Sequence, residues 1–205
     1  MARIYYLTGL VVAILLTLSL NASAALISGG VSDADIKART QLDGAYGINF
    51  IDLVNPITGD GWLTSWSIYA GGTGEVKLII FRANGPNYDV VGTSPFETIS
   101  AAGKYTFTDL GSSGMAVKAG DYLGWYYPVT NSAGVISFDY GADNVAWVEP
   151  WGSQPEAATP WMYNFVQGRT YSINVSGSTV PLPPSVLLLG SGLMGLGLLR
   201  FRRKA

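Results

Sequence analysis

The sequence contains no cysteine and no histidine among its 205 residues. Without cysteine the chain forms no disulfide, binds no metal through thiolates and has no thiol nucleophile. Without histidine it lacks the most common general base and metal ligand, and the Ser-His-Asp arrangement of many hydrolases. Fourteen acidic residues are present, but no spacing singles out a pair for glycoside hydrolysis. We therefore expect a protein that is not an enzyme.

Basic residues are scarce in the middle of the chain. All fourteen acidic residues lie between Asp33 and Glu156, whereas five of the twelve cations lie at the two ends, at Arg3, Arg200, Arg202, Arg203 and Lys204. The middle therefore carries seven cations against fourteen acids, a net charge of −7. An acidic surface without a cluster of Lys and Arg repels phosphates, so we expect no nucleic-acid partner.

The first 24 residues have the layout of a secretory signal peptide. Arg3 is followed by an apolar run over 7–20, and small residues stand at Ala22 and Ala24. This order of a cation, a short apolar core and an A-x-A site predicts cleavage after Ala24, so that the mature chain begins at Ala25. The alternative is a retained N-terminal anchor. The sequence therefore predicts export of the middle of the chain.

Residues 25–179 predict a single extracytoplasmic domain of the all-β class. Short alternating segments are separated by Gly, Asn, Asp and Pro, and only 32–42 predicts a short helix, capped by Ser32 or Asp33. Strands are expected near 46–53, 62–70, 75–83, 88–99, 104–109, 121–127, 136–140 and 171–176. This number of short antiparallel strands favours a β-sandwich or jelly roll.

Alternation of side chains predicts which faces of these strands are buried. Residues of one parity are expected to point inward in three strands, namely Trp62, Trp66 and Ile68, then Ile136, Phe138 and Tyr140, then Tyr171, Ile173 and Val175. The run at 75–83 is apolar on both parities around its centre. It therefore predicts a strand in the middle of a sheet.

The phrase AVKAGDYLGWYYP, residues 116–128, predicts a tight turn between two strands. At 118–121 Gly120 supplies a positive φ, and Asp121 can bond back to the backbone. The phrase resembles the V-x-A-G-D-x-[LIV]-G element of extracellular β-sandwich domains. Together with GWLTSWSIYA and VKLIIFRANG, the resemblance implies a jelly-roll-like module of the kind found in secreted bacterial proteins.

The segment Gly141–Gly168 predicts a long connection rich in aromatic residues, at Trp147, Trp151, Trp161, Tyr163 and Phe165. Connections of this length in a compact domain are usually functional or disordered. An aromatic platform suits sugar binding, which makes polysaccharide a candidate partner and a carbohydrate-binding module the alternative function. The other interpretation is that the rings cover an open end of the sandwich and only provide buried area.

Four oxygen-bearing side chains lie in the same part of the chain, at Asp139, Asp143, Asn144 and Glu149. Calcium takes ligands of this kind, so these residues form a candidate calcium site. Calcium is the one cofactor that we consider for this sequence. Their spacing matches no EF-hand loop, and turn formation with surface solubility explains them equally well. The sequence leaves both interpretations open.

The last 26 residues fall into three parts. The first is the stretch VPLPPS, which comprises Val180, Pro181, Leu182, Pro183, Pro184 and Ser185. It is followed by an apolar run over 185–201 and by a basic end at Arg200, Arg202, Arg203 and Lys204. As a helix, 185–201 would span roughly 25 Å, which is near the lower limit for crossing a bilayer. The basic end would stay in the cytoplasm. The sequence therefore predicts a membrane-anchored precursor whose domain lies outside.

This order of parts resembles the PEP-CTERM sorting signal in its VPLPA/VPLPPS variant, with Leu182 where the common form has Glu. The signal peptide at the other end accompanies that family. The resemblance implies that an exosortase, a membrane-embedded cysteine protease-like enzyme of Gram-negative bacteria, cuts near Pro183–Ser185. It also implies a passage from the inner membrane to the cell surface or medium, and a setting of exopolysaccharide and biofilm formation. The residues alone also allow a plain C-terminal anchor.

Overall fold

The structure is a computed structural model that describes residues 24–44, 47–111, 114–148, 160–161 and 165–179. Within these ranges all strand pairings are antiparallel, and the one helical element is the 3-10 turn η2 at Asp33–Asp35. The predicted all-β class with antiparallel sheets is confirmed. Over the same ranges no helix has the length and apolar character to cross a bilayer. The predicted span at 185–201 lies outside them.

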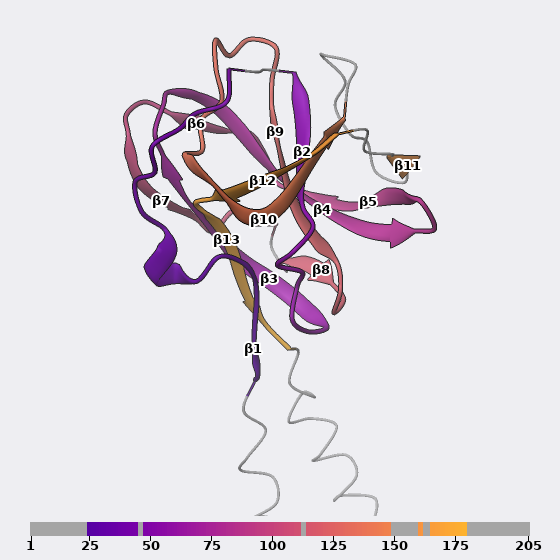
Figure 1. The fold of residues 1–205 in the computed structure, drawn as a ribbon. Helices are drawn as coiled ribbons and strands as arrows, with labels where there is room; N and C mark the ends of the chain where they lie inside the picture. The colour runs from indigo at the N-terminus through magenta and orange to yellow at the C-terminus, as the bar shows by residue number, and fades with distance from the viewer. Residues whose placement is uncertain (1–23, 45–46, 112–113, 149–159, 162–164, 180–205) are drawn as a thin grey trace, which may run out of the picture. The chain divides into compact units, whose positions relative to one another are not determined.

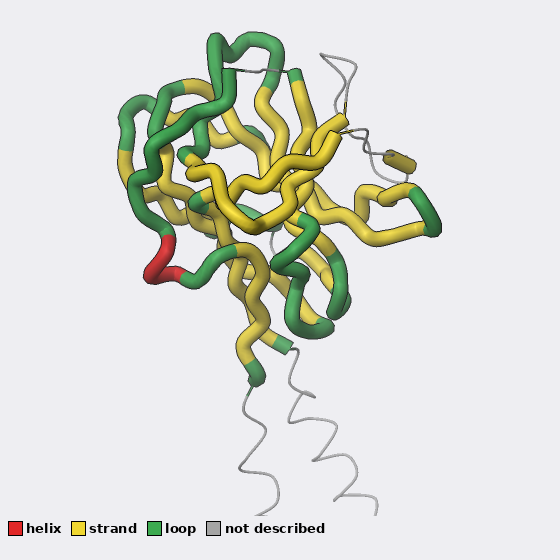
Figure 2. The backbone as a smooth tube through the Cα atoms, in the orientation of Figure 1, coloured by secondary structure: helices red, strands yellow, loops and turns green. Residues whose placement is uncertain are grey.

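The compact unit Leu26–Thr179 contains two sheets (Figures 1 and 2). The smaller sheet has five strands in the order β1-β13-β3-β7, with β8 also paired to β3. Its strands are β1 (Leu26–Gly30), β3 (Gly61–Ala70), β7 (Gly103–Phe107), β8 (Met115–Val117) and β13 (Ile173–Ser178).

The larger sheet has eight strands in the order β11-β5-β4-β9-β2-β10-β12, with β6 also paired to β4. Its strands are β2 (Ile48–Asp52), β4 (Gly74–Asn84), β5 (Asn87–Thr93), β6 (Glu97–Ile99), β9 (Tyr122–Tyr127), β10 (Phe138–Val148), β11 (Pro160–Trp161) and β12 (Phe165–Tyr171).

The main hydrophobic core draws side chains from both sheets. Trp66 of β3 and Val175 of β13 are buried in the same cluster as Leu78 of β4 and Trp125 of β9. The Trp125 ring stacks on Phe50, with the two ring centroids 5.3 Å apart. Full burial of one such side chain contributes about 2–3 kcal/mol to stability. The two layers therefore form a β-sandwich-like fold.

A second hydrophobic cluster lies on the other face of the larger sheet. Ile79 and Phe81 of β4 belong to it, whereas Leu78 and Ile80 of the same strand belong to the main core. Strand β4 is bordered by β5 on one side and β9 on the other. The prediction that 75–83 forms a mid-sheet strand, apolar on both faces, is confirmed.

The turn at 118–121 also has the predicted form. Gly120 adopts a φ of 86°, which favours glycine. The Asp121 carboxylate accepts a hydrogen bond from the Lys118 backbone N–H at 2.8 Å. The turn joins β8 to β9. The side chain that was expected to bond back to the backbone does so.

The predicted helix at 32–42 is wrong beyond its first turn. Only η2 is helical, and the Ser32 hydroxyl donates to the Asp35 carboxylate at 2.6 Å instead of capping a backbone N–H. Further along, Gln41 and Phe138 exchange two backbone hydrogen bonds of 2.9 and 3.0 Å, from N–H to C=O in each direction. These contacts with β10 hold the segment in an extended conformation.

Two predictions about strand faces are also wrong. Trp62 is only half-buried, and Leu63 is buried in the core in its place, because the register between β3 and β13 shifts at Gly177. Tyr140 is 63% exposed, although Phe138 on the same strand is buried. The strand β10 leaves the regular pairing with β12 between Tyr140 and Asn144, so its alternation breaks there.

Candidate functional site

The two ends of the described domain lie side by side. Strands β1 and β13 are paired antiparallel, with Leu26 opposite Ser178 (Figure 1). Ala24 and Ala25, which flank the predicted signal-cleavage bond, directly precede β1, and Ala25 is exposed. Ala22 and the sorting segment from Val180 to Ser185 lie outside the described residues, as do Arg200, Arg202, Arg203 and Lys204. Both predicted processing signals therefore adjoin the same end of the sandwich.

The last residues of β13 are paired on both edges. Gly177 and Ser178 face β1 on one side, and Leu63 and Trp62 of β3 on the other. Gly61 has a φ of 155°, and a Cβ there would collide with the Ser178 carbonyl oxygen. The fold therefore extends to the last residue before the predicted sorting segment.

The predicted aromatic connection is divided among three strands. Residues 141–148 belong to β10, 160–161 form β11 and 165–168 belong to β12. The remaining predicted rings, Trp151 and Tyr163, lie outside the described residues. The expectation of one long connection is therefore wrong at both of its ends. The cause is that the pairing of β10 with β12 is irregular between Tyr140 and Asn144, so polar and apolar residues do not alternate regularly along 141–148.

The side chain of Trp147 packs against the main core instead of projecting as a platform. Its ring lies 4.9 Å from the Arg169 guanidinium carbon, and Phe138 lies 4.6 Å from the same carbon. A cation over aromatic faces in a partly desolvated place contributes about 1–2 kcal/mol. Trp147 therefore fits the interpretation of buried area better than that of a sugar platform.

Arg169 also takes part in a buried ion pair that no pattern in the sequence indicates. Its Nη1 lies 2.6 Å from Oδ1 of Asp43, and the Tyr171 hydroxyl donates to the same carboxylate at 2.9 Å. The side chains of Asp43 and Arg169 are 2% and 15% exposed. Burial raises the pKa of Asp43 to about 6, against hydrogen bonds from Tyr171 and the charge of Arg169 that lower the pKa.

The outer face of the larger sheet carries a group of aromatic side chains that the sequence did not single out. Tyr88 and Tyr122 meet edge to face at 5.5 Å between ring centroids. Phe96 lies 6.1 Å from Tyr126, and the Lys77 ammonium lies 4.7 Å from the Phe96 centroid. Burial lowers the pKa of Lys77 and raises that of Tyr88. We call these four aromatic residues, together with Lys77, the outer aromatic group.

The backbone of Trp161, one of the predicted aromatic residues, lies beside this group in the sheet. Strand β11 pairs with β5, placing Trp161 opposite Tyr88 and Pro160 opposite Asp89. Tyr88 is half-buried. The alternation of Tyr122 and Tyr126 with the core residues Leu123 and Trp125 was the sequence signal that could have revealed the group.

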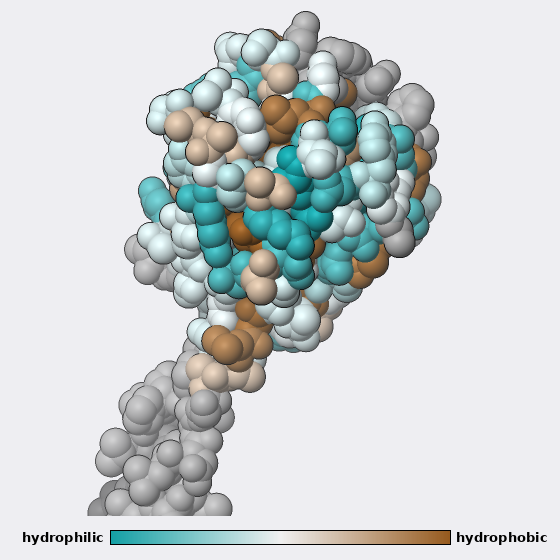
Figure 3. Space-filling model, turned by 60° about the vertical axis from the view of Figure 1, so that its left-hand side comes forward, coloured by the Kyte–Doolittle hydropathy of each residue, from teal (hydrophilic) through white to brown (hydrophobic). Residues whose placement is uncertain are grey.

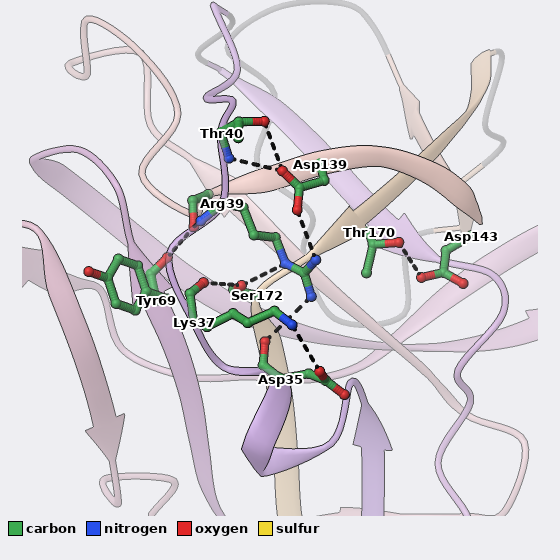
Figure 4. Close-up of polar contacts among 10 residues, drawn as sticks. Asp35, Lys37, Arg39, Thr40, Tyr69, Asp139, Asp143, Thr170 and Ser172 are labelled. Carbon is green, nitrogen blue, oxygen red and sulfur yellow. Dashed lines mark hydrogen bonds and ion pairs between the residues drawn. The ribbon is translucent and has the colours of Figure 1, made fainter.

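The candidate calcium ligands do not converge among the described residues (Figure 4). Asp139 accepts hydrogen bonds from the Thr40 N–H and hydroxyl at 2.9 and 2.8 Å, and those bonds lower its pKa. Asp143 accepts from the Thr170 hydroxyl at 2.6 Å. Asn144 is exposed, and Glu149 lies outside the described residues. The calcium site stays a prediction, and the two aspartates already have structural partners.

Arg39 ties the segment after η2 to the sandwich (Figure 4). Its side chain is 8% exposed, and its Nε donates to the Ser172 hydroxyl at 2.8 Å. Its Nη1 lies 3.3 Å from Asp139 Oδ2. The Ser172 hydroxyl donates in turn to the Lys37 carbonyl at 2.6 Å. A buried guanidinium with these acceptors acts as a clamp and offers no reactive group.

The face of the domain seen in Figure 3 is mostly polar, with scattered apolar residues. Leu26, Tyr140 and Val166 are the most exposed large hydrophobic residues among those described. Comparison of the chain with protein-family models, with curated proteins and with solved structures found no match.

Proposed function

We propose that the chain is an exported, non-enzymatic surface or extracellular-matrix protein, sorted by an exosortase-type system and linked to exopolysaccharide and biofilm. Its domain is a jelly-roll-like module that is first held at the inner membrane and then delivered to the cell surface or medium. The pairing of Leu26 with Ser178 is the observation that supports this proposal most strongly.

The physical reason is that both chain ends carry membrane-directed segments whose basic ends favour the cytoplasmic side. Arg3 and the basic end at 200–204 both favour the cytoplasmic side, so each segment leaves the domain outside. Opposite residues of antiparallel strands have Cα atoms about 5 Å apart. The folded domain can therefore hang from either segment, or from both, without unfolding. If the two chain ends lay at opposite ends of the sandwich, the length of β3, about 30 Å, would separate them.

A double substitution, Pro181→Ala with Pro183→Ala, tests the proposal. A plain anchor needs only hydrophobicity and a basic stop, so its insertion is indifferent to these prolines. A segment that an enzyme reads as an extended strand depends on them, because proline restricts itself and its predecessor. We expect the double variant to accumulate at full length in the membrane. The control is Pro56→Ala, at an exposed loop proline, which should be processed normally.

The second candidate function is polysaccharide binding, now through the outer aromatic group. The observation that favours it is the pairing of Trp161 with Tyr88, beside Tyr122. Tyr88→Ala with Tyr122→Ala should weaken retention in affinity gels that contain the host's exopolysaccharide, whereas Tyr140→Ala should not. Equal retention of all three proteins would remove this candidate.

A further inference from the structure

The fold leaves little chain between the sandwich and the bond that is to be cut. Thr179 is the last described residue, and Ser178 before it is paired with Leu26 and Trp62. A cut between Pro183 and Ser185 therefore lies four or five residues beyond Thr179. A fully extended chain spans at most about 3.6 Å per residue, so 180–184 reaches about 18 Å at most. The catalytic centre of any protease must come within that distance of the domain.

We propose that this end of the sandwich is the contact surface for the enzyme that processes the C-terminal segment. The surface comprises the ends of β1 and β13 with the neighbouring parts of β3 and β8, where Ser178, Trp62 and Ala116 lie opposite one another in adjacent strands. The inference rests on the proposed function, because it presumes that the segment is cut. It adds that the enzyme meets the folded domain as well as the segment.

The surface itself is built to stay folded while the segment is extended. The Asp60 carboxylate accepts a hydrogen bond from the Ala119 N–H at 2.8 Å and so joins the loop before β3 to the turn after β8. Ile57 and Asp121 are linked from N–H to C=O at 2.7 Å. Pulling on 180–185 therefore acts on a strand that is hydrogen-bonded on both edges. Peeling β13 away to lengthen the segment would break these pairings.

Two exposed alanines provide matched positions for a test. Ala116 lies on β8, opposite Trp62, within the proposed surface. Ala101 lies two residues before β7, whose Gly103 pairs with Ala70 at the far end of β3. The two ends of β3 are separated by about 30 Å. Because the natural chain has no cysteine, Ala116→Cys and Ala101→Cys each create one unique labelling site.

The experiment labels each full-length variant with maleimide-polyethylene glycol of about 5 kDa and incubates it with detergent-treated membranes of the native host. Conversion to the shortened form is followed by intact mass. We expect the label at position 116 to slow conversion at least fivefold relative to unlabelled protein. The label at position 101 should slow it less than twofold. Each variant without label is the control for the substitution itself.

A spacer makes the test specific for the short distance. A twelve-residue Gly-Ser insertion between Thr179 and Val180 adds about 20 Å of average reach. In the protein labelled at position 116 it should restore conversion to within twofold of the unlabelled rate. Equal slowing by both labels, or a block that the spacer does not relieve, would overturn the contact surface. Absence of conversion of unlabelled wild-type protein would overturn the proposed function as well.

Discussion

Asp121 and Arg82 form a two-pronged ion pair at the turn between β8 and β9. The Arg82 Nε donates to Oδ1 at 2.7 Å and its Nη2 to Oδ2 at 2.7 Å. The Asp121 side chain is 2% exposed and the Arg82 side chain is 38% exposed. The same carboxylate accepts the Lys118 N–H. One side chain therefore closes the turn and joins β9 to β4.

Asp121→Asn should lower the free energy of unfolding by about 2 kcal/mol. The Arg82 guanidinium loses its counter-charge, at a cost reduced by its partial exposure to solvent, and the turn loses its charged acceptor. Chemical denaturation should show a lower midpoint with an unchanged slope. Asp109→Asn, at an exposed position, serves as control and should change stability by less than about 0.5 kcal/mol. Equal midpoints for the two variants would contradict this role of Asp121.

The stability of the domain should depend on pH through Asp43. Its folded pKa of about 6 lies above the ordinary 3.8, so the folded state binds the proton more tightly. The resulting stabilisation is fully present below pH 3.8 and is lost as the pH rises through 6. A difference of about two pKa units corresponds to at most about 3 kcal/mol.

Asp43→Asn isolates this contribution from the other carboxyl groups, such as Asp52, whose pKa burial also raises. Unfolding free energies of both proteins should be measured from pH 4 to 7.5. We expect the wild-type protein to lose stability relative to the variant as the pH rises. A difference that is constant over this range would show that Asp43 does not titrate there.

Arg39→Lys should loosen the segment between η2 and β2. Lysine cannot reproduce the planar fork that reaches Ser172 and Asp139 together. We expect a loss of about 1–2 kcal/mol and faster amide hydrogen exchange in 37–42. Lys37→Arg changes an exposed side chain of the same segment and should leave exchange unaltered. Unchanged exchange in both variants would argue against the clamp.

The boundary of the folded domain can be tested by two truncations. Deleting 185–205 should leave cooperative unfolding unchanged, since the described fold ends before that segment. Deleting 177–205 also removes Gly177 and Ser178, which pair with both β1 and β3, and should cost several kcal/mol. Calorimetry of the two proteins distinguishes these cases. Equal melting temperatures would mean that the end of β13 contributes nothing.

Strand positions could be predicted where alternation is regular. Tyr171 at the end of β12 and Ile173 and Val175 of β13 are buried as expected, and the doubly apolar run of β4 lies in mid-sheet. Where strand pairing is irregular, alternation predicted the wrong buried residues. The register shift beside Gly177 exchanged Trp62 for Leu63 in the core, and the break after Tyr140 hid the second half of β10. Alternation carries no information about where a bulge interrupts it.

Long-range polar contacts could not be predicted. Asp43 and Arg169 are 126 residues apart in the sequence, and only the fold brings them together. Asp139 was a candidate calcium ligand because of its carboxylate oxygens, and its partners Arg39 and Thr40 come from a segment that was expected to be helical. By contrast, the contact of Asp121 with Lys118 spans three residues, and its turn was predicted.

The central claim is tested most directly by the intact mass of the mature protein isolated from its native host. The account predicts a chain that begins at Ala25 and ends between Pro183 and Ser185, without the basic residues at 200–204. The protein carrying Pro181→Ala and Pro183→Ala should begin at Ala25 and retain Ala205. A wild-type mass that includes Ala205, or the same shortened mass for both proteins, would contradict the account.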